Sequence, residues 1–89
     1  MIEIAFDSSF KRAFRKKIAG NPGKEARFWK RVAIFKRDPF TPMLRTHKLS
    51  GELRDRWSFS LEYDLRVVFF FAGEKRAVFV DIGSHGEVY

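Results

Sequence analysis

Apolar residues follow two different spacings along the chain. Near the start, Ile2, Ile4 and Phe6 occupy every second position, which predicts a half-buried strand over residues 1–6. Between Phe10 and Ile18 the apolar residues recur every three or four positions, with basic residues filling the gaps. This second spacing predicts an amphipathic helix with a basic outer face.

Capping and helix-breaking residues mark the ends of this helix and predict another. The polar segment 7–9 offers N-cap side chains, while segment 20–23 combines two glycines with a proline and stops the first helix. A second helix is expected from about Lys24 to Lys36, before the prolines at 39 and 42, so the pair is typical of an αα-hairpin. The apolar residues expected on its inner side are Ala26, Phe28, Trp29, Val32, Ala33 and Phe35.

The remainder of the chain predicts strands. Between 56 and 62 the alternation is strict and places Trp57, Phe59 and Leu61 on one face, whereas 65–72 is almost entirely apolar and predicts a central strand. Strands are expected over 43–49, 56–62, 65–72 and 77–82, with turns at 63–64 and 73–74. Such short turns predict an antiparallel meander. The prediction is one α+β domain spanning 1–89, in the order β-α-α-β-β-β-β, with both helices on one sheet face.

Composition narrows the class of protein. A chain of 89 residues forms one small domain, and its eleven Phe and two Trp supply a bulky core. The absence of Cys excludes disulfides and thiolate metal sites. No apolar run approaches the length of about 18 residues needed to cross a membrane, and the first residues do not resemble a signal peptide, so a cytoplasmic location is expected.

Positive charge is concentrated in the first part of the chain. The formal net charge is +7, and residues 1–37 contain eleven Lys and Arg against three Asp and Glu. Residues 38–89 contain seven against eight. The predicted helices therefore carry the whole excess, which favours binding to a polyanion such as nucleic acid, or to an acidic protein. The alternative is a solvated surface that only provides solubility.

Arg66 interrupts the most apolar predicted strand. A guanidinium in a central strand is costly unless it finds a partner or reaches solvent. One possibility is an ion pair with Glu62 or Asp64 across the hairpin. The other is that Arg66 extends from the face without helices and binds phosphate, which guanidinium suits in charge and shape.

Two histidines, His47 and His85, lie near the ends of predicted strands. Imidazole transfers protons near neutral pH, so this pair with Asp64 and Arg66 suits acid–base cleavage of RNA by its own 2′-hydroxyl, without a metal or other cofactor. Tyr89 or Phe40 could stack an unpaired base. No spacing of ligands typical of a metal site, no glycine-rich phosphate loop and no nucleophile elbow around Ser58 or Ser60 is present.

Three sequence motifs, taken together, resemble those of a known family. They are Leu44-x-x-His47-x-Leu49-x-Gly51, Trp57-Ser58-x-x-Leu61-x-x-Asp64-x-Arg66-Val67-Val68-Phe69 and Ile82-Gly83-Ser84-His85-x-x-Val88-Tyr89. Their order and spacing resemble the RelE/ParE superfamily of bacterial toxins, in particular its YafQ-like and YoeB-like branches, over nearly the whole chain. The resemblance implies a ribosome-dependent mRNA endonuclease that is neutralised by a cognate antitoxin.

The resemblance also implies roles for individual residues. His47 matches a catalytic histidine, Asp64 an acidic residue of the following hairpin, Arg66 the arginine at the scissile phosphate, His85 a near-terminal histidine and Tyr89 an aromatic that holds the substrate base. His85 is expected to be the acid, and Asp64 or His47 the base. The residues expected to bind substrate are Lys48, Arg54, Arg56 and Tyr89. The implied partners are the antitoxin, mRNA in the ribosomal A site and rRNA, with no membrane.

Two other functions remain open. A ParE-like relative would inhibit a protein such as DNA gyrase without chemistry of its own, although such chains usually lack counterparts of His85 and Tyr89. A decayed toxin would only bind its antitoxin. The second alternative is suggested by Ser60 and Phe59, which stand where YafQ-like or YoeB-like members have histidine or basic residues.

Overall fold

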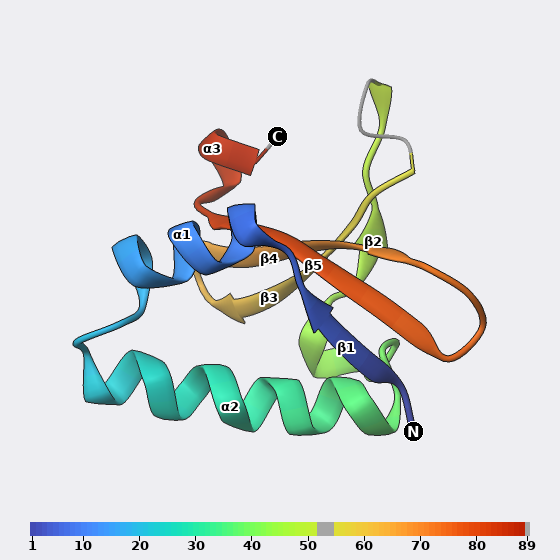
Figure 1. Ribbon diagram of the computed structural model, residues 1–89, viewed down its shortest axis with the longest axis horizontal. Coiled ribbons are helices and arrows are strands. Elements are labelled where there is room, and N and C mark those ends of the chain that lie inside the picture. Colours follow the sequence, from blue (N-terminus) through green and yellow to red (C-terminus); the bar gives the residue numbers. More distant parts are fainter. Residues whose placement is uncertain (52–54, 89) are drawn as a thin grey trace.

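The computed structural model describes residues 1–51 and 55–88, and for His85 it describes the backbone alone. Five strands form one sheet in the order β1-β5-β4-β3-β2 (Figure 1). The elements are β1 (Glu3–Phe6), α1 (Ser8–Lys17), α2 (Pro22–Arg37), the 3-10 turn η1 (Pro42–Leu44), β2 (His47–Lys48), β3 (Trp57–Glu62), β4 (Leu65–Phe71), β5 (Arg76–Gly83) and α3 (His85–Val88).

Strands β2 to β5 pair antiparallel in chain order, and over β3 to β5 this is the meander that the short turns predict. β1 then joins the far edge by pairing parallel to β5, with Ile4 opposite Ala77. The parallel pair is possible because the two helices and the meander separate β1 from β5 in the chain. The sheet is therefore mixed, and β4 lies at its centre.

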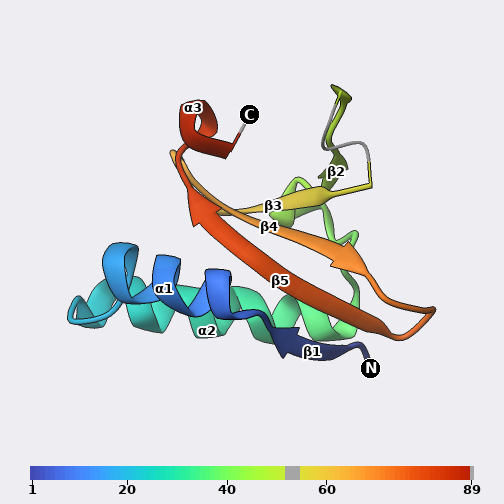
Figure 2. The same ribbon diagram turned by 45° about the horizontal axis from the view of Figure 1, so that its top comes forward.

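Helices α1 and α2 lie on the same face of the sheet, whereas α3 follows the end of β5 (Figure 2). This arrangement confirms the predicted α+β fold with the long helices on one side. In the described part of the chain, no helix is both long and apolar enough to span a membrane.

A cluster of phenylalanines forms the core between the helices and the sheet. Phe35 of α2 is completely buried, and its ring centroid lies 4.9 Å from that of Phe69, 5.0 Å from that of Phe59 and 5.4 Å from that of Phe79. Each of these pairs is stabilised by ring contacts as well as by burial. Because the chain has no Cys to form a disulfide, its fold depends on this packing.

The second helix differs from its prediction in two ways. It begins at Pro22, earlier than the expected Lys24, because Asn21 caps it by accepting a hydrogen bond from the backbone N–H of Lys24, and proline is well tolerated in the first turn. Its inner side is also narrower than expected. Trp29 is 53% exposed and Ala26 and Ala33 are exposed, whereas Ile34, which was not in the predicted set, packs against the core.

The strand expected over 43–49 is wrong for most of its length. Pro42 to Leu44 form a 3-10 turn, and Arg45 then adopts a left-handed conformation, so only His47 and Lys48 pair with β3. Proline favours such a turn because its φ is fixed and it has no N–H to donate to a strand.

Truncation of Phe35 to Ala should lower the free energy of unfolding by about 3–5 kcal/mol, the usual loss for a buried aromatic side chain. Denaturant unfolding followed by circular dichroism measures it. Tyr63, which is fully exposed in the turn after β3, provides the control, and Tyr63→Ala should change the same free energy by less than about 0.5 kcal/mol. Equal losses in the two variants would contradict this description of the core.

Candidate active site on the sheet face opposite the long helices

The face of the sheet opposite α1 and α2 carries polar side chains where the other face carries phenylalanine. Successive side chains of a strand point to opposite faces. Phe59 and Phe69 belong to the core cluster, so Ser58 of β3 and Arg66 and Val68 of β4 belong to the other face. Ser58 is completely buried although it is polar. A buried hydroxyl at this place requires hydrogen-bond partners.

Arg66 is held by contacts from two neighbouring segments. Its Nε donates a hydrogen bond of 3.1 Å to Oγ of Ser58, and its Nη2 donates one of 3.1 Å to the carbonyl oxygen of Arg45. The side chain is only partly buried. These bonds fix the plane of the guanidinium and leave its charge near solvent, which is the geometry that phosphate recognition needs.

His47 lies beside this guanidinium. It stands opposite Ser58 in the β2–β3 register, so its side chain belongs to the same face as Arg66. Its Nδ1 is 3.0 Å from the carbonyl oxygen of Arg45 and 3.4 Å from Nη2 of Arg66. The structure thus brings His47 and Arg66 together, as the site prediction requires.

The two acidic residues of the β3–β4 hairpin are placed differently. Glu62 forms ion pairs with two cations of α2, Arg27 and Lys24, the second at 3.9 Å. It therefore fastens α2 to β3. Asp64 is exposed in the two-residue turn before β4, two positions from Arg66.

The C-terminal helix α3, which the strand and helix patterns do not predict, lies over the same face as Arg66. Val88 packs with Val68 and Leu49 in a small apolar cluster on this face. Gly83 stands opposite Arg66 in the β4–β5 register, and a Cβ there would approach Cγ1 of Val88 to 3.0 Å. The missing side chain of Gly83 lets the helix lie close to the sheet. The backbone of His85 begins this helix, and Val88 at its other end packs on the face of the predicted site.

A capping box and an ion pair hold α3 in place. The backbone N–H of Ser84 donates to the Glu87 carboxylate, and the backbone N–H of Glu87 donates to Oγ of Ser84. Lys17, at the end of α1, forms an ion pair of 2.7 Å with the same carboxylate. The Lys17 ammonium and the Ser84 amide lower the pKa of Glu87 to about 2. The Ser84-x-x-Glu87 spacing is the sequence signal from which this helix could have been predicted.

Of the residues expected to bind substrate, the structure describes Lys48 and Arg56. Lys48 is exposed, with its Nζ 6.0 Å from the ring of Trp57. Cζ of Arg56 lies 4.7 Å from the ring centroid of Phe70, and its guanidinium forms an ion pair with Asp55. Arg54 and Tyr89 lie outside the described residues. Two other positions of interest can be placed: Ser60 is buried and donates from its hydroxyl to the carbonyl of Glu62, and Phe59 is a core residue that does not face the site.

Two contributions to this site do not follow from the sequence pattern. The sequence suggests Ser58 only as a nucleophile, whereas in the structure its hydroxyl accepts from Nε of Arg66 and orients it. The sequence gives no signal for Arg45, whose carbonyl contacts both His47 and Arg66. No sequence motif indicates that a backbone carbonyl orients these two side chains. Within the described residues, no cluster of three or more side chains is placed to hold a metal ion.

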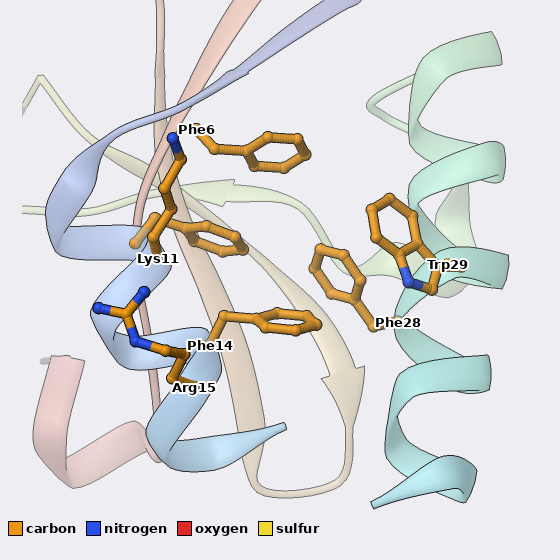
Figure 3. A pocket seen from close by; sticks show the side chains of 7 residues that line it. Phe6, Lys11, Phe14, Arg15, Phe28 and Trp29 are labelled. Atoms are coloured by element: carbon orange, nitrogen blue, oxygen red, sulfur yellow. The ribbon is translucent and has the colours of Figure 1, made fainter. Parts of the chain in front are cut away.

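A second surface feature lies between the two long helices. Figure 3 shows aromatic rings of β1 and α1 facing Phe28 and Trp29 of α2 across an open pocket of about 250 Å³. Its rim on α1 carries two cations, Lys11 and Arg15. The full lining is Phe6, Phe10, Lys11, Phe14, Arg15, Phe28 and Trp29. An open apolar groove with a basic edge is the kind of surface that binds another protein.

The low pKa of Glu87 makes the attachment of α3 sensitive to acid. The pKa of Glu87 is lower in the folded protein than its ordinary value of 4.5, so its contribution to stability is complete above that pH and is lost as the pH falls towards 2. NMR titration of the Glu87 carboxyl should give this low pKa, and Lys17→Gln should raise it. The destabilisation caused by Glu87→Gln should shrink as the pH falls, whereas Glu74→Gln in the exposed β4–β5 turn should have little effect at any pH. An ordinary pKa at Glu87 would contradict the ion pair.

Comparison with known proteins finds similarity in the fold and not in the sequence. No family model and no curated protein sequence matches the chain. A metal-bound toxin from Helicobacter pylori has 24% identity and a TM-score of 0.74, with 100% of each chain covered. A YoeB/ParE toxin from Agrobacterium tumefaciens has 17% identity and a TM-score of 0.76, covering 94% of this chain and 99% of that one. YafQ in the DinJ–YafQ complex from E. coli has 15% identity and a TM-score of 0.68, covering 100% and 99%. The chain therefore has the fold of these toxins, which is the fold that the sequence resemblance implies.

Proposed function

We propose that this protein is the toxin of a toxin–antitoxin pair and that it arrests translation by cutting mRNA in the ribosomal A site. The observation that supports the proposal most strongly is the contact of His47 and Arg66 on one sheet face, with Val88 of α3, the helix that begins at His85, packed on that face. The fold shared with known toxins supports the assignment of the protein as a toxin. The proposed site needs no metal and no cofactor.

The proposed reaction is attack of a ribose 2′-hydroxyl on the adjacent phosphodiester. A base removes the 2′-hydroxyl proton while the new O–P bond forms, and an acid gives a proton to the 5′-oxygen as its bond to phosphorus breaks. The products are a 2′,3′-cyclic phosphate and a 5′-hydroxyl. Charge increases on the phosphate oxygens during the attack, so a fixed cation beside them lowers the barrier.

The residues present can supply each of these roles. Arg66 is oriented by Ser58 and by a backbone carbonyl, and would hold the phosphate. His47 or Asp64 would act as the base, and His85 as the acid. Lys48 and Arg56 would contact flanking phosphates, and the proposal retains Arg54 and Tyr89 as contacts to the substrate. The fixed guanidinium is the part of this assignment that the geometry supports best.

The basic helices suit the proposed site of action. On α1 and α2, many cations are exposed on the side away from the core: Lys11, Arg12, Arg15, Lys16, Lys30, Lys36 and Arg37. Contacts between such side chains and rRNA phosphates release counterions, which drives binding independently of sequence.

The groove between α1 and α2 is proposed to bind the antitoxin. Its walls are apolar, Trp29 is 53% exposed, and Lys11 and Arg15 lie along one edge. These features fit an antitoxin segment with apolar anchors flanked by acidic residues. The groove lies on the opposite side of the sheet from Arg66, so a segment that also blocks the active site must extend around the edge of the domain.

The proposed chemistry predicts that mRNA from cells expressing the protein without antitoxin contains new cuts within codons. Mapping of RNA ends should find 5′-hydroxyl and cyclic phosphate termini, both in these cells and after cleavage on purified ribosomes. Arg66→Ala should slow cleavage by about 10²–10³-fold, and His47→Ala or His85→Ala by about 10²–10⁴-fold. Lys75→Ala, which removes a cation from an exposed turn, should leave the rate unchanged.

Three results would contradict this proposal. An Arg66→Ala, His85→Ala double variant as toxic as the parent would exclude the assigned residues. Intact mRNA together with broken or relaxed DNA would favour inhibition of a target such as DNA gyrase. Normal growth upon expression without antitoxin would favour a protein whose remaining role is to bind its antitoxin.

The groove assignment predicts that Trp29→Ala weakens the complex with the antitoxin encoded beside this protein by about 30-fold or more, the loss expected for an aromatic hot spot of about 2 kcal/mol. Calorimetry on the purified pair measures this loss. Met43→Ala is the matched control, because Met43 is 51% exposed and lies outside the groove. Equal affinity for Trp29→Ala and the parent would place the antitoxin elsewhere.

A further inference from the structure

Arg45 has a backbone conformation that is unusual for its residue type. Its φ is 50° and its ψ is 43°, and among the described residues it is the one residue other than glycine with positive φ. This left-handed region is disfavoured for residues with a Cβ, because the Cβ approaches the backbone carbonyl. Such conformations persist where the surrounding structure imposes them, often at functional sites.

The left-handed residue has a local role and a longer-range one. Locally it ends the η1 turn, with its N–H donating to the carbonyl of Pro42. A glycine at this position would end the turn equally well, and ending the turn does not require a contact by the Arg45 carbonyl. That carbonyl is directed at the candidate site, 3.1 Å from Nη2 of Arg66 and 3.0 Å from Nδ1 of His47. One backbone oxygen thus orients two site residues that come from different strands.

This contact determines which nitrogen of His47 carries the proton. A carbonyl oxygen only accepts hydrogen bonds, so Nδ1 of His47 must be the donor. The guanidinium of Arg66 could donate to Nδ1 across 3.4 Å only if Nδ1 carried no proton, and Nδ1 would then lie as a second acceptor 3.0 Å from the carbonyl oxygen, so the shorter contact decides the assignment. In the neutral ring the lone pair then lies on Nε2. The assignment follows from hydrogen-bond chemistry, since two donors can share one carbonyl but cannot bond to each other.

We propose that Arg45 is a positioning residue whose left-handed backbone directs its carbonyl at His47 and Arg66, thereby fixing the Nδ1–H tautomer of His47 and the plane of the Arg66 guanidinium. The role belongs to the backbone, and the exposed Arg45 side chain is not needed for it. The catalytic consequence rests on the proposed function: Nε2 is then the nitrogen that exchanges a proton with the RNA.

Two substitutions separate the backbone from the side chain. Arg45→Gly removes the guanidinium but favours the left-handed conformation, so the carbonyl should keep its direction. Arg45→Val places a β-branched residue where it is least tolerated and should turn the carbonyl away. Met43→Val changes an exposed residue of the preceding turn that has an ordinary φ, and is the control.

The first readout is the ¹⁵N NMR spectrum of histidine-labelled protein at a pH where the ring is neutral, with the His47 signals identified from their loss in His47→Gln. The parent, Arg45→Gly and Met43→Val should show the Nδ1–H tautomer, and Arg45→Val should lose it. The second readout is mRNA cleavage on ribosomes. Arg45→Gly should cleave at the parental rate, whereas Arg45→Val should be slower by about 10²-fold, the usual consequence of misplacing a reacting group.

Each outcome has a defined meaning. An Nε2–H tautomer in the parent or in Arg45→Gly overturns the proposal, even if Arg45→Val fails to fold. Loss of cleavage in Arg45→Gly with the tautomer intact also overturns it, because the side chain would then be what matters. The NMR result does not require activity, so a parent without nuclease activity but with the expected tautomer would refute the proposed function and leave the positioning role standing.

Discussion

The sheet face opposite the long helices depends on how one positive charge is held in the middle strand of the sheet. Without hydrogen-bond partners, the guanidinium of Arg66, held within the apolar strand β4, would destabilise the fold. Its bonds to Ser58 and to the Arg45 carbonyl offset that cost while its side chain remains only partly buried. Because the partners come from β3 and from the turn before β2, the position of Arg66 requires both of these segments to be folded against β4. The same bonds that make the charge tolerable also orient it for phosphate.

The two faces of the sheet differ in what they contribute: one forms the core and the other carries the candidate site. One face is filled by phenylalanines packed beneath α2, and this core provides stability without disulfides. The other face can therefore carry Ser58, His47 and Arg66, which contribute little apolar burial. Helix α1 takes part in both surfaces, because it lines the groove between the helices and its Lys17 holds α3 through Glu87. The groove proposed to bind the antitoxin is thus linked by one helix to the segment that carries His85.

Sequence reasoning predicts the parts of this molecule whose side chains alternate or recur regularly. The strict alternation around Phe59 gives β3 and the face that its core side chains occupy, and the interruption at Arg66 identifies a candidate site residue, because a charge in an apolar strand requires partners or solvent. The prediction of a strand at 43–49 is wrong, because the backbone there is determined by Pro42 and by the left-handed Arg45, which hydrophobic spacing does not register. Helix α3 is too short to show periodicity, although its capping residues, Ser84 and Glu87, are visible in the sequence. The role of the Arg45 carbonyl could not be predicted, since a backbone oxygen leaves no mark on the residue type.

The proposed function requires this face of the sheet, and not the basic helices alone, to bind the reacting phosphate. It is tested most directly by an NMR titration with a short RNA that carries a 2′-deoxyribose at the cleavage position and so binds without being cut. The side-chain NMR signals of Arg66 and His47 should shift together and saturate with a single dissociation constant. Shifts confined to the cations of α1 and α2, with Arg66 and His47 unchanged, would contradict it.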